Sequence, residues 1–168
     1  LFLLLKHGRR RRALLLGGAE DRWSPEAEAL LFAAARADHV EKTIRPALEA
    51  GRWVLSDRFL DSSIAYQGYA GALGADVIRR INACAIADCL PDRTLLLVTG
   101  EGAERARARD GGSADRIGTR GSAYHAAVAA GFEQLARVEP ARVRLVDAAG
   151  PPEAVTERLL AELSDLLP

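Results

Sequence analysis

The pattern of apolar and polar positions predicts short strands that alternate with helices. Three short runs rich in Leu and Val have the length of strands: Trp53–Leu55, Thr94–Val98 and Arg142–Val146. Apolar residues at helical spacing predict helices over residues 24–51, 75–89, 122–139 and 152–166. The leucine-rich start, Leu1–Leu5, is a further candidate strand. Strands that alternate with helices predict an α/β protein with a parallel sheet, in which the strands are buried.

The helix over 24–51 has clear start and stop signals. Ser24 can cap it, Pro25 suits its first turn, and Glu26 suits the positive end of the helix dipole. We expect Pro46 to kink or restart the helix and Gly51 to end it.

Composition narrows the class of protein. The 168 residues are 49% hydrophobic with a formal net charge of zero, which favours one globular domain and argues against a nucleic-acid partner. No apolar run approaches the roughly 20 residues that span a bilayer. Leu1–Leu5 precedes the basic block Arg9–Arg12, the wrong order for a signal peptide. We therefore expect a cytoplasmic protein with no membrane partner; an arginine-rich nucleic-acid-binding protein is the minor alternative.

A polar cluster follows the strand predicted at Trp53–Leu55. Open parallel sheets bind ligands at the carboxyl ends of their strands, where Asp57 and Arg58 would lie. An arginine there can grip a phosphate with paired donors, and the carboxylate can hold a metal or its water shell. Taken alone, the two residues are better explained as an Asp-Arg pair that caps a strand-to-helix loop, but the hydroxyls, aromatic, amide and glycine that follow favour the ligand site.

Two other stretches carry candidate chemistry. Phe32 and Arg36 are four residues apart on one helical face and could stack on and hydrogen-bond a planar base, although core packing plus a surface arginine explains them as well. Arg105, Arg107 and Arg109 precede a glycine-rich stretch, 110–120, that contains Arg116. Such a segment is either a lid that neutralises phosphoryl charge or a solvated arginine helix with a surface loop.

The run from Asp57 to Gly68, DRFLDSSIAYQG, resembles the signature of bacterial thymidylate kinases, which phosphorylate dTMP to dTDP with ATP. The likeness covers roughly Ala13 to the C-terminus. Residues 24–36, SPEAEALLFAAAR, look like the family's thymine-binding helix, residues 90–97 like its next strand, and residues 105–117 like its lid.

The resemblance implies a role for each matching residue. Phe32 would stack on thymine, Arg36 would donate to a base carbonyl, and Ser63 and Gln67 would lie along the base, Ser62 being a weaker candidate. Tyr66 would pack against the sugar and select deoxynucleotides. The residues implied to act on phosphate are Asp57, Arg58, Arg109 and Arg116: Arg58 would hold the dTMP phosphate, Asp57 would bind Mg²⁺ through water, and the other two would cover the transferred phosphoryl group.

The family also opens with a P-loop, G-x-x-x-x-G-K-[ST], which binds ATP phosphates and magnesium. The 168 residues contain no match to this motif, and residues 1–12 resemble nothing in the family. We expect a single thymidylate-kinase-like domain over 1–168, with the three-layer α/β fold of P-loop nucleoside monophosphate kinases truncated at its N-terminus. The resemblance implies that the domain's function would be the formation of dTDP for dTTP biosynthesis, with ATP as co-substrate and Mg²⁺ as cofactor. We expect that these 168 residues alone do not convert dTMP to dTDP. The alternative to a thymidylate kinase is a non-catalytic remnant that binds dTMP. The helix over 24–45 is a candidate homodimer face.

Overall fold

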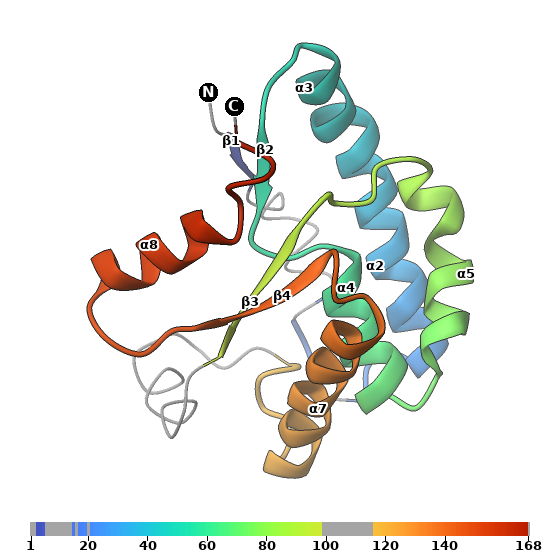
Figure 1. Cartoon of the computed structure of the whole chain (residues 1–168). Helices are drawn as coiled ribbons and strands as arrows, with labels where there is room; N and C mark the ends of the chain where they lie inside the picture. The colour runs from blue at the N-terminus through green and yellow to red at the C-terminus, as the bar shows by residue number, and fades with distance from the viewer. Residues whose placement is uncertain (1–2, 6–14, 16, 20, 99–115, 168) are drawn as a thin grey trace. The chain divides into compact units, whose positions relative to one another are not determined.

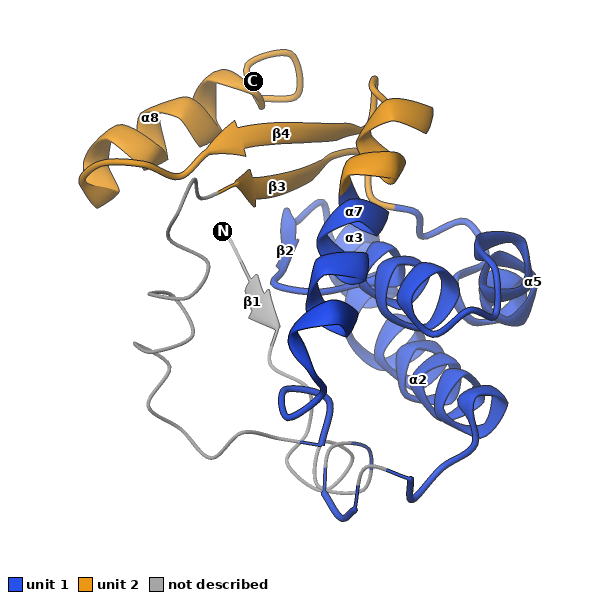
Figure 2. Cartoon of the chain, turned by 90° about the horizontal axis from the view of Figure 1, so that it is seen from below, with its two compact units in different colours: residues 1–90, 114–132 blue, residues 91–113, 133–168 orange. Residues whose placement is uncertain are grey.

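The structure is a computed structural model of the chain, and it describes residues 3–5, 15, 17–19, 21–98 and 116–167 (Figure 1). Its contacts divide the chain into two compact units (Figure 2). Unit 1 comprises residues 1–90 and 114–132, and unit 2 comprises residues 91–113 and 133–168. In the described parts of the chain, every helix is too short or too polar to traverse a bilayer.

The long helix of unit 1 is built from three successive segments. Helix α2 (Pro25–His39) begins where predicted, since the Ser24 side chain accepts a hydrogen bond from the Ala27 amide at 3.2 Å. A π-helical segment, η1 (Val40–Ile44), follows, and α3 (Arg45–Glu49) has Pro46 in its first turn. The prediction that Pro46 restarts the helix is confirmed.

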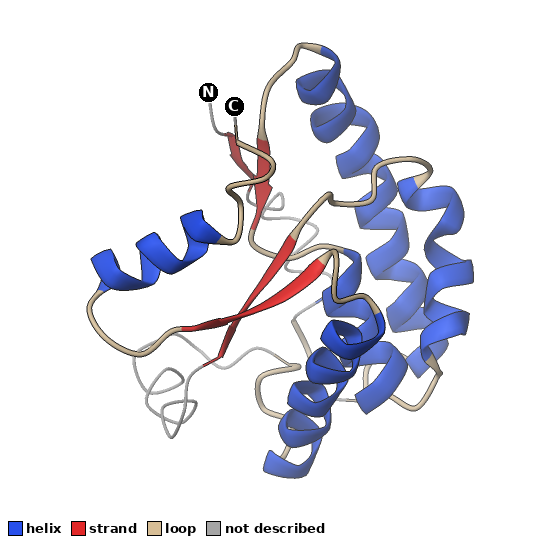
Figure 3. Ribbon diagram, viewed as in Figure 1, coloured by secondary structure: helices blue, strands red, loops and turns tan. Residues whose placement is uncertain are grey.

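The strands of unit 1 form a parallel pair. Strand β1 (Leu3–Leu5) lies beside β2 (Val54–Ser56), with Leu4 opposite Leu55, so the strand suggested within Leu1–Leu5 is present. After β2 the chain forms α4 (Leu60–Ser63), the π-helical segment η2 (Ile64–Ala70) and α5 (Ala75–Ile86) (Figure 3).

Gly68 lies inside η2, before the link to α5. A Cβ atom built on Gly68 would meet the Cα of Ala75 and the Cγ1 of Ile78, both at 3.3 Å. Gly68 thus lets η2 and α5 approach closely, and the link itself starts at Gly71.

Helices α2 and α5 pack side by side along their length in unit 1 (Figure 1). Most of the buried apolar side chains of this unit come from α2, η1, η2 and α5: Ala29, Ala33, Ala35, Val40, Ile44, Ile64, Ala65, Ile78, Ala85 and Ile86. Burial of this apolar surface is the main force that holds the helices together.

Unit 2 contains the second parallel pair, β3 (Thr94–Val98) and β4 (Val143–Asp147), followed by α8 (Pro152–Ala161). Helix α7 (Ser122–Val138) begins in unit 1 and ends in unit 2. Arg93 fixes the C-terminal turn to the start of β3 through hydrogen bonds to the Glu162 carbonyl and, at 2.6 Å, the Asp165 carboxylate. The α/β class with parallel strands is therefore confirmed, with the described strands in two pairs.

The expectation that the strands are buried was wrong at several leucines and valines. Leu55 of β2, Leu97 and Val98 of β3, and Leu145 of β4 are each exposed. A two-stranded sheet consists only of edge strands, so its apolar side chains are not enclosed as they are on the central strands of a larger sheet.

Replacing Ser24 with Ala should lower the free energy of unfolding by about 1 kcal/mol, because the first turn of α2 loses its side-chain acceptor. Urea denaturation followed by circular dichroism would measure this. Ser164→Ala, in the C-terminal turn, is the control and should change stability by no more than a few tenths of a kcal/mol. Equal effects of the two changes would contradict the capping role.

Candidate substrate-binding site

Three residues spaced four apart form one stripe of α2, because residues at this spacing lie on the same helical face. They are Glu28, Phe32 and Arg36. Glu28 and Arg36 are buried and Phe32 is half-buried. Buried charged side chains are uncommon unless they are paired, so their partners determine what the stripe does.

The guanidinium of Arg36 joins three helices. It donates from Nη1 to Oδ1 of Asn82 on α5, and from Nη2 to Oγ of Ser63 at 2.6 Å and to the Phe59 carbonyl at 3.2 Å. Burial lowers the pKa of Arg36 to about 10, and the Asp61 carboxylate opposes part of that shift. Arg36 therefore stays protonated at neutral pH and its hydrogen bonds are charge-assisted.

Glu28 is the acceptor of a second buried network. Its Oε1 accepts from Nε2 of Gln67 at 2.8 Å, and its Oε2 accepts from Nη2 of Arg116 at 2.5 Å and from Nη2 of Arg120 at 2.8 Å. Arg116 also donates to the Leu15 carbonyl at 3.1 Å. One carboxylate thus links α2, η2 and the segment that leads into α7.

Arg120 extends this network to a pair of tyrosines. Its Nη1 donates to the Tyr124 hydroxyl at 2.7 Å, and that hydroxyl donates to the Tyr66 carbonyl at 3.0 Å. Burial raises the pKa of the Tyr124 hydroxyl, against the opposing effect of Arg120. Tyr124 therefore remains a neutral donor at physiological pH, and it fixes the backbone at Tyr66.

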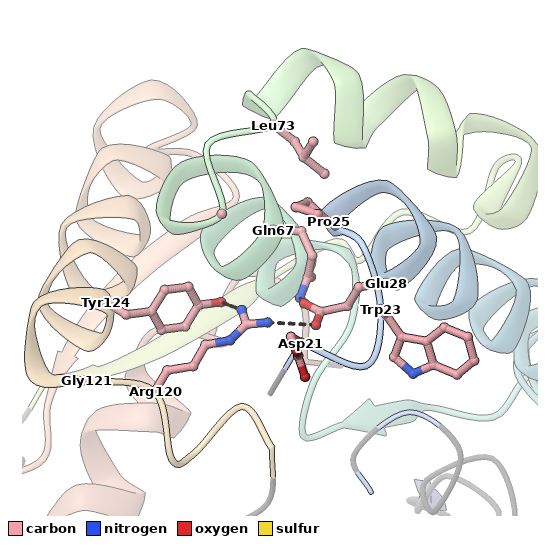
Figure 4. Close-up of a pocket in the computed structure, with 10 residues that line it drawn as sticks. Asp21, Trp23, Pro25, Glu28, Gln67, Leu73, Arg120, Gly121 and Tyr124 are labelled. Atoms are coloured by element: carbon pink, nitrogen blue, oxygen red, sulfur yellow. Dashed lines mark hydrogen bonds and ion pairs between the residues drawn. The ribbon is translucent and has the colours of Figure 1, made fainter. Parts of the chain in front are cut away.

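A cavity of about 520 Å³ opens beside these groups within unit 1 (Figure 4). The side chains of Gln67, Glu28 and Arg120 come together at its wall. Its lining combines apolar and charged groups: Asp21, Trp23, Pro25, Glu28, Gln67, Gly71, Leu73, Arg120, Gly121 and Tyr124. This mixture suits a ligand that has both a planar apolar part and polar edges.

Asp57 and Arg58 lie just after β2 and are both exposed. The Arg58 guanidinium carbon is 5.0 Å from the centroid of the Tyr66 ring, a cation–π arrangement that leaves donors for an anion. No group of three or more acidic, His or Cys side chains forms a metal site among the described residues. Mg²⁺ is commonly held by one or two carboxylates, waters and substrate phosphates, so a single exposed Asp57 fits that cation.

The sequence profile of the family described as thymidylate kinase matches residues 6–159, so the expectation that residues 1–12 resemble nothing in the family was wrong from residue 6 onward. A thymidylate kinase of Rhizorhabdus wittichii is 57% identical over 159 residues, which cover 94% of this chain and 76% of that protein. A thymidylate kinase of Symbiobacterium thermophilum is 45% identical over 157 residues, which cover 94% and 73%. The chain belongs to the thymidylate kinase family.

The fold agrees with that assignment. The crystal structure of a thymidylate kinase from Ehrlichia chaffeensis aligns with a TM-score of 0.72 and covers 99% of this chain and 81% of that one. At 23% sequence identity, this likeness shows the fold alone.

The structure brings several of the predicted thymidylate kinase residues into contact with one another. Ser63 contacts Arg36, and Arg58 lies over Tyr66. Arg116 is buried rather than in an open loop, bound to Glu28. Arg105, Arg107, Arg109 and the block Arg9–Arg12 lie outside the described residues. The roles of all the predicted site residues remain predictions.

Sequence reasoning overlooked four residues of these networks, namely Glu28, Asn82, Arg120 and Tyr124. Glu28 could have been found, because it continues the spacing of Phe32 and Arg36 by one more helical turn. Asn82 could not, because its partner Arg36 is 46 residues away in the chain and nothing local marks the pair.

Arg36→Lys should lower the free energy of unfolding by about 2 kcal/mol, because one ammonium group cannot reach all three of the guanidinium's acceptors. Chemical denaturation would measure the loss. Arg80→Lys, the same change at an exposed position of α5, should leave the midpoint unchanged. If the two variants unfold alike, the Arg36 hydrogen bonds do not hold these helices together.

Proposed function

We propose that this site binds dTMP as the acceptor of a phosphoryl group from ATP, so that the family reaction yields dTDP for dTTP biosynthesis. The observation that carries the proposal is the match to thymidylate kinases over 94% of the chain, together with the way the structure groups the matching residues. Arg36 is fixed beside Phe32 on one face of α2, and Arg58 lies against Tyr66.

The base would occupy the α2 side of the site. Phe32 would stack on thymine, Arg36 would donate to a base carbonyl, and Ser63 and Gln67 would lie along the base edge. Support comes from the hydrogen bonds that hold Arg36 in one orientation, because a fixed donor discriminates between bases better than a mobile one. Tyr66 would pack against the deoxyribose and exclude a ribose 2′-hydroxyl.

The phosphate would occupy the β2 end of the site. Arg58 would hold the dTMP phosphate through two donors, and Asp57 would contact Mg²⁺ through water. Arg109 and Arg116 would neutralise the transferred phosphoryl group, for which Arg116 would have to exchange its bonds to Glu28. Phosphoryl transfer needs chiefly alignment and positive charge, and these residues would supply both around the acceptor.

The 168 residues contain no G-x-x-x-x-G-K-[ST] motif, so the donor nucleotide has no recognisable phosphate loop here. We infer that the family's P-loop segment is missing from these 168 residues and that, by themselves, they bind dTMP without phosphorylating it. A non-catalytic dTMP-binding protein is the second candidate.

We also infer a cytoplasmic location and a homodimer formed through the helix over 24–45. Leu30, which lies within this range on α2, is 56% exposed, which supports an apolar contact there.

Calorimetry with the purified chain tests the proposal. We expect saturable heat with dTMP, and Arg58→Ala should weaken dTMP binding about 10- to 100-fold, because a charge-assisted contact to phosphate is lost. Thymidine, which lacks the phosphate, should bind both proteins equally. Arg80→Ala removes an exposed arginine elsewhere and should leave dTMP affinity unchanged.

The same preparations separate the two candidates. Heat with dTMP but none with Mg-ATP, and no dTDP formed from the two together, identifies the non-catalytic binder. Robust dTDP formation would refute our inference that these residues do not turn over. Absence of any dTMP binding would refute the proposed function itself.

A further inference from the structure

We propose that Glu28 is a positioning residue that determines which hydrogen-bonding face Gln67 presents to the base. The inference rests on the proposed function for the identity of the ligand, and on the contacts of Glu28 for everything else.

The first step is the chemistry of the contact between the two side chains. An ionised carboxylate has acceptors only, whereas a carboxamide has a donor end and an acceptor end. Because Oε1 of Glu28 lies 2.8 Å from Gln67, the NH₂ end of Gln67 must face Glu28. With the NH₂ end of Gln67 directed to Glu28, its carbonyl Oε1 lies at the opposite end of the amide and can accept a hydrogen bond from a ligand.

The second step is that Glu28 is held in place. Its Oε2 accepts from Arg116 and Arg120, so its Oε1 is directed to Gln67. The side chain of Glu28 is 3% exposed, and Gln67 is 4% exposed on η2. Neither side chain can turn without breaking a buried, charge-assisted hydrogen bond.

The third step is the position of this contact. Gln67 and Glu28 both line the cavity (Figure 4). Glu28 stands one helical turn before Phe32 and two turns before Arg36 on the same face of α2. Through Glu28, the amide of Gln67 thus contacts the same stripe of α2 that carries Phe32 and Arg36.

The consequence is selectivity between pyrimidines. Thymine carries a hydrogen on N3 and donates there, whereas N3 of cytosine is an acceptor. A Gln67 oxygen fixed toward the ligand pairs with the donor and repels the acceptor, and a buried group left unpaired is strongly disfavoured. Glu28 would therefore favour dTMP over dCMP without touching either nucleotide.

Two substitutions separate orientation of the amide from general support of the fold. Glu28→Gln keeps the shape of the side chain but offers both a donor and an acceptor. The amide of Gln67 can therefore flip and present either its NH₂ or its oxygen to the ligand. Glu28→Asp keeps a negative charge that can pair with Arg116 and Arg120. Because its side chain is one methylene shorter, its carboxylate no longer reaches Gln67. Glu26→Gln, the same chemical change on an exposed carboxylate of α2, is the matched control.

Calorimetry with dTMP and dCMP gives the first readout. The ratio of the two affinities should fall about tenfold in Glu28→Gln and in Glu28→Asp, because one hydrogen bond no longer discriminates. It should stay unchanged in Glu26→Gln. In a Gln67→Leu background, Glu28→Asp should have no further effect on the ratio. A loss of affinity that is equal for both nucleotides would show a structural role only and overturn the proposal.

A second readout needs no nucleotide. The side-chain NH₂ signals of Gln67, assigned by their absence in Gln67→Leu, should exchange slowly with solvent in the unsubstituted protein and at least tenfold faster in Glu28→Asp. Unchanged exchange would overturn the proposal even if no nucleotide bound. Failure of dTMP to bind the unsubstituted protein, with the expected exchange result, would instead refute the proposed function.

Discussion

A buried guanidinium needs acceptors inside the protein, and this requirement at Arg36 organises the first unit. Its acceptors come from the Phe59 carbonyl, from Ser63 on α4 and from Asn82 on α5, while Arg36 itself belongs to α2. An unpaired charge at this depth would cost several kcal/mol, so the elements can pack together only in the arrangement that supplies all three acceptors. The geometry of the proposed base-binding face is thus a consequence of satisfying one charge.

Glu28, two turns earlier on α2, is a buried carboxylate, and it needs hydrogen-bond donors inside the protein just as Arg36 needs acceptors. The Glu28–Gln67 and Arg36–Ser63 hydrogen bonds both join α2 to the α4–η2 segment, and Phe32 lies between them on the stripe. The groups that hold these helices together are therefore the groups proposed to face the base, which couples substrate selectivity to stability. Asp57 and Arg58 are exposed, so the proposed phosphate end of the site can vary with less effect on the fold.

Local signals in the sequence were sufficient for the elements but not for the networks. Ser24 and Pro46 mark helix boundaries by their own chemistry, and Thr94–Val98 is a strand with the predicted limits. Contacts such as Glu28 to Arg116, 88 residues apart, depend on tertiary packing that periodicity does not encode. The exposure of Leu97 was missed for a similar reason, since burial of a strand depends on how many strands the sheet contains.

The most direct test of the account is a crystal structure of this chain with dTMP. We predict the thymine against Phe32 with a carbonyl toward Arg36, N3 toward the Gln67 oxygen, and the phosphate on Arg58. Ordered dTMP at a different place in the protein, or with its phosphate on the α2 side and its base away from Phe32, would contradict the account.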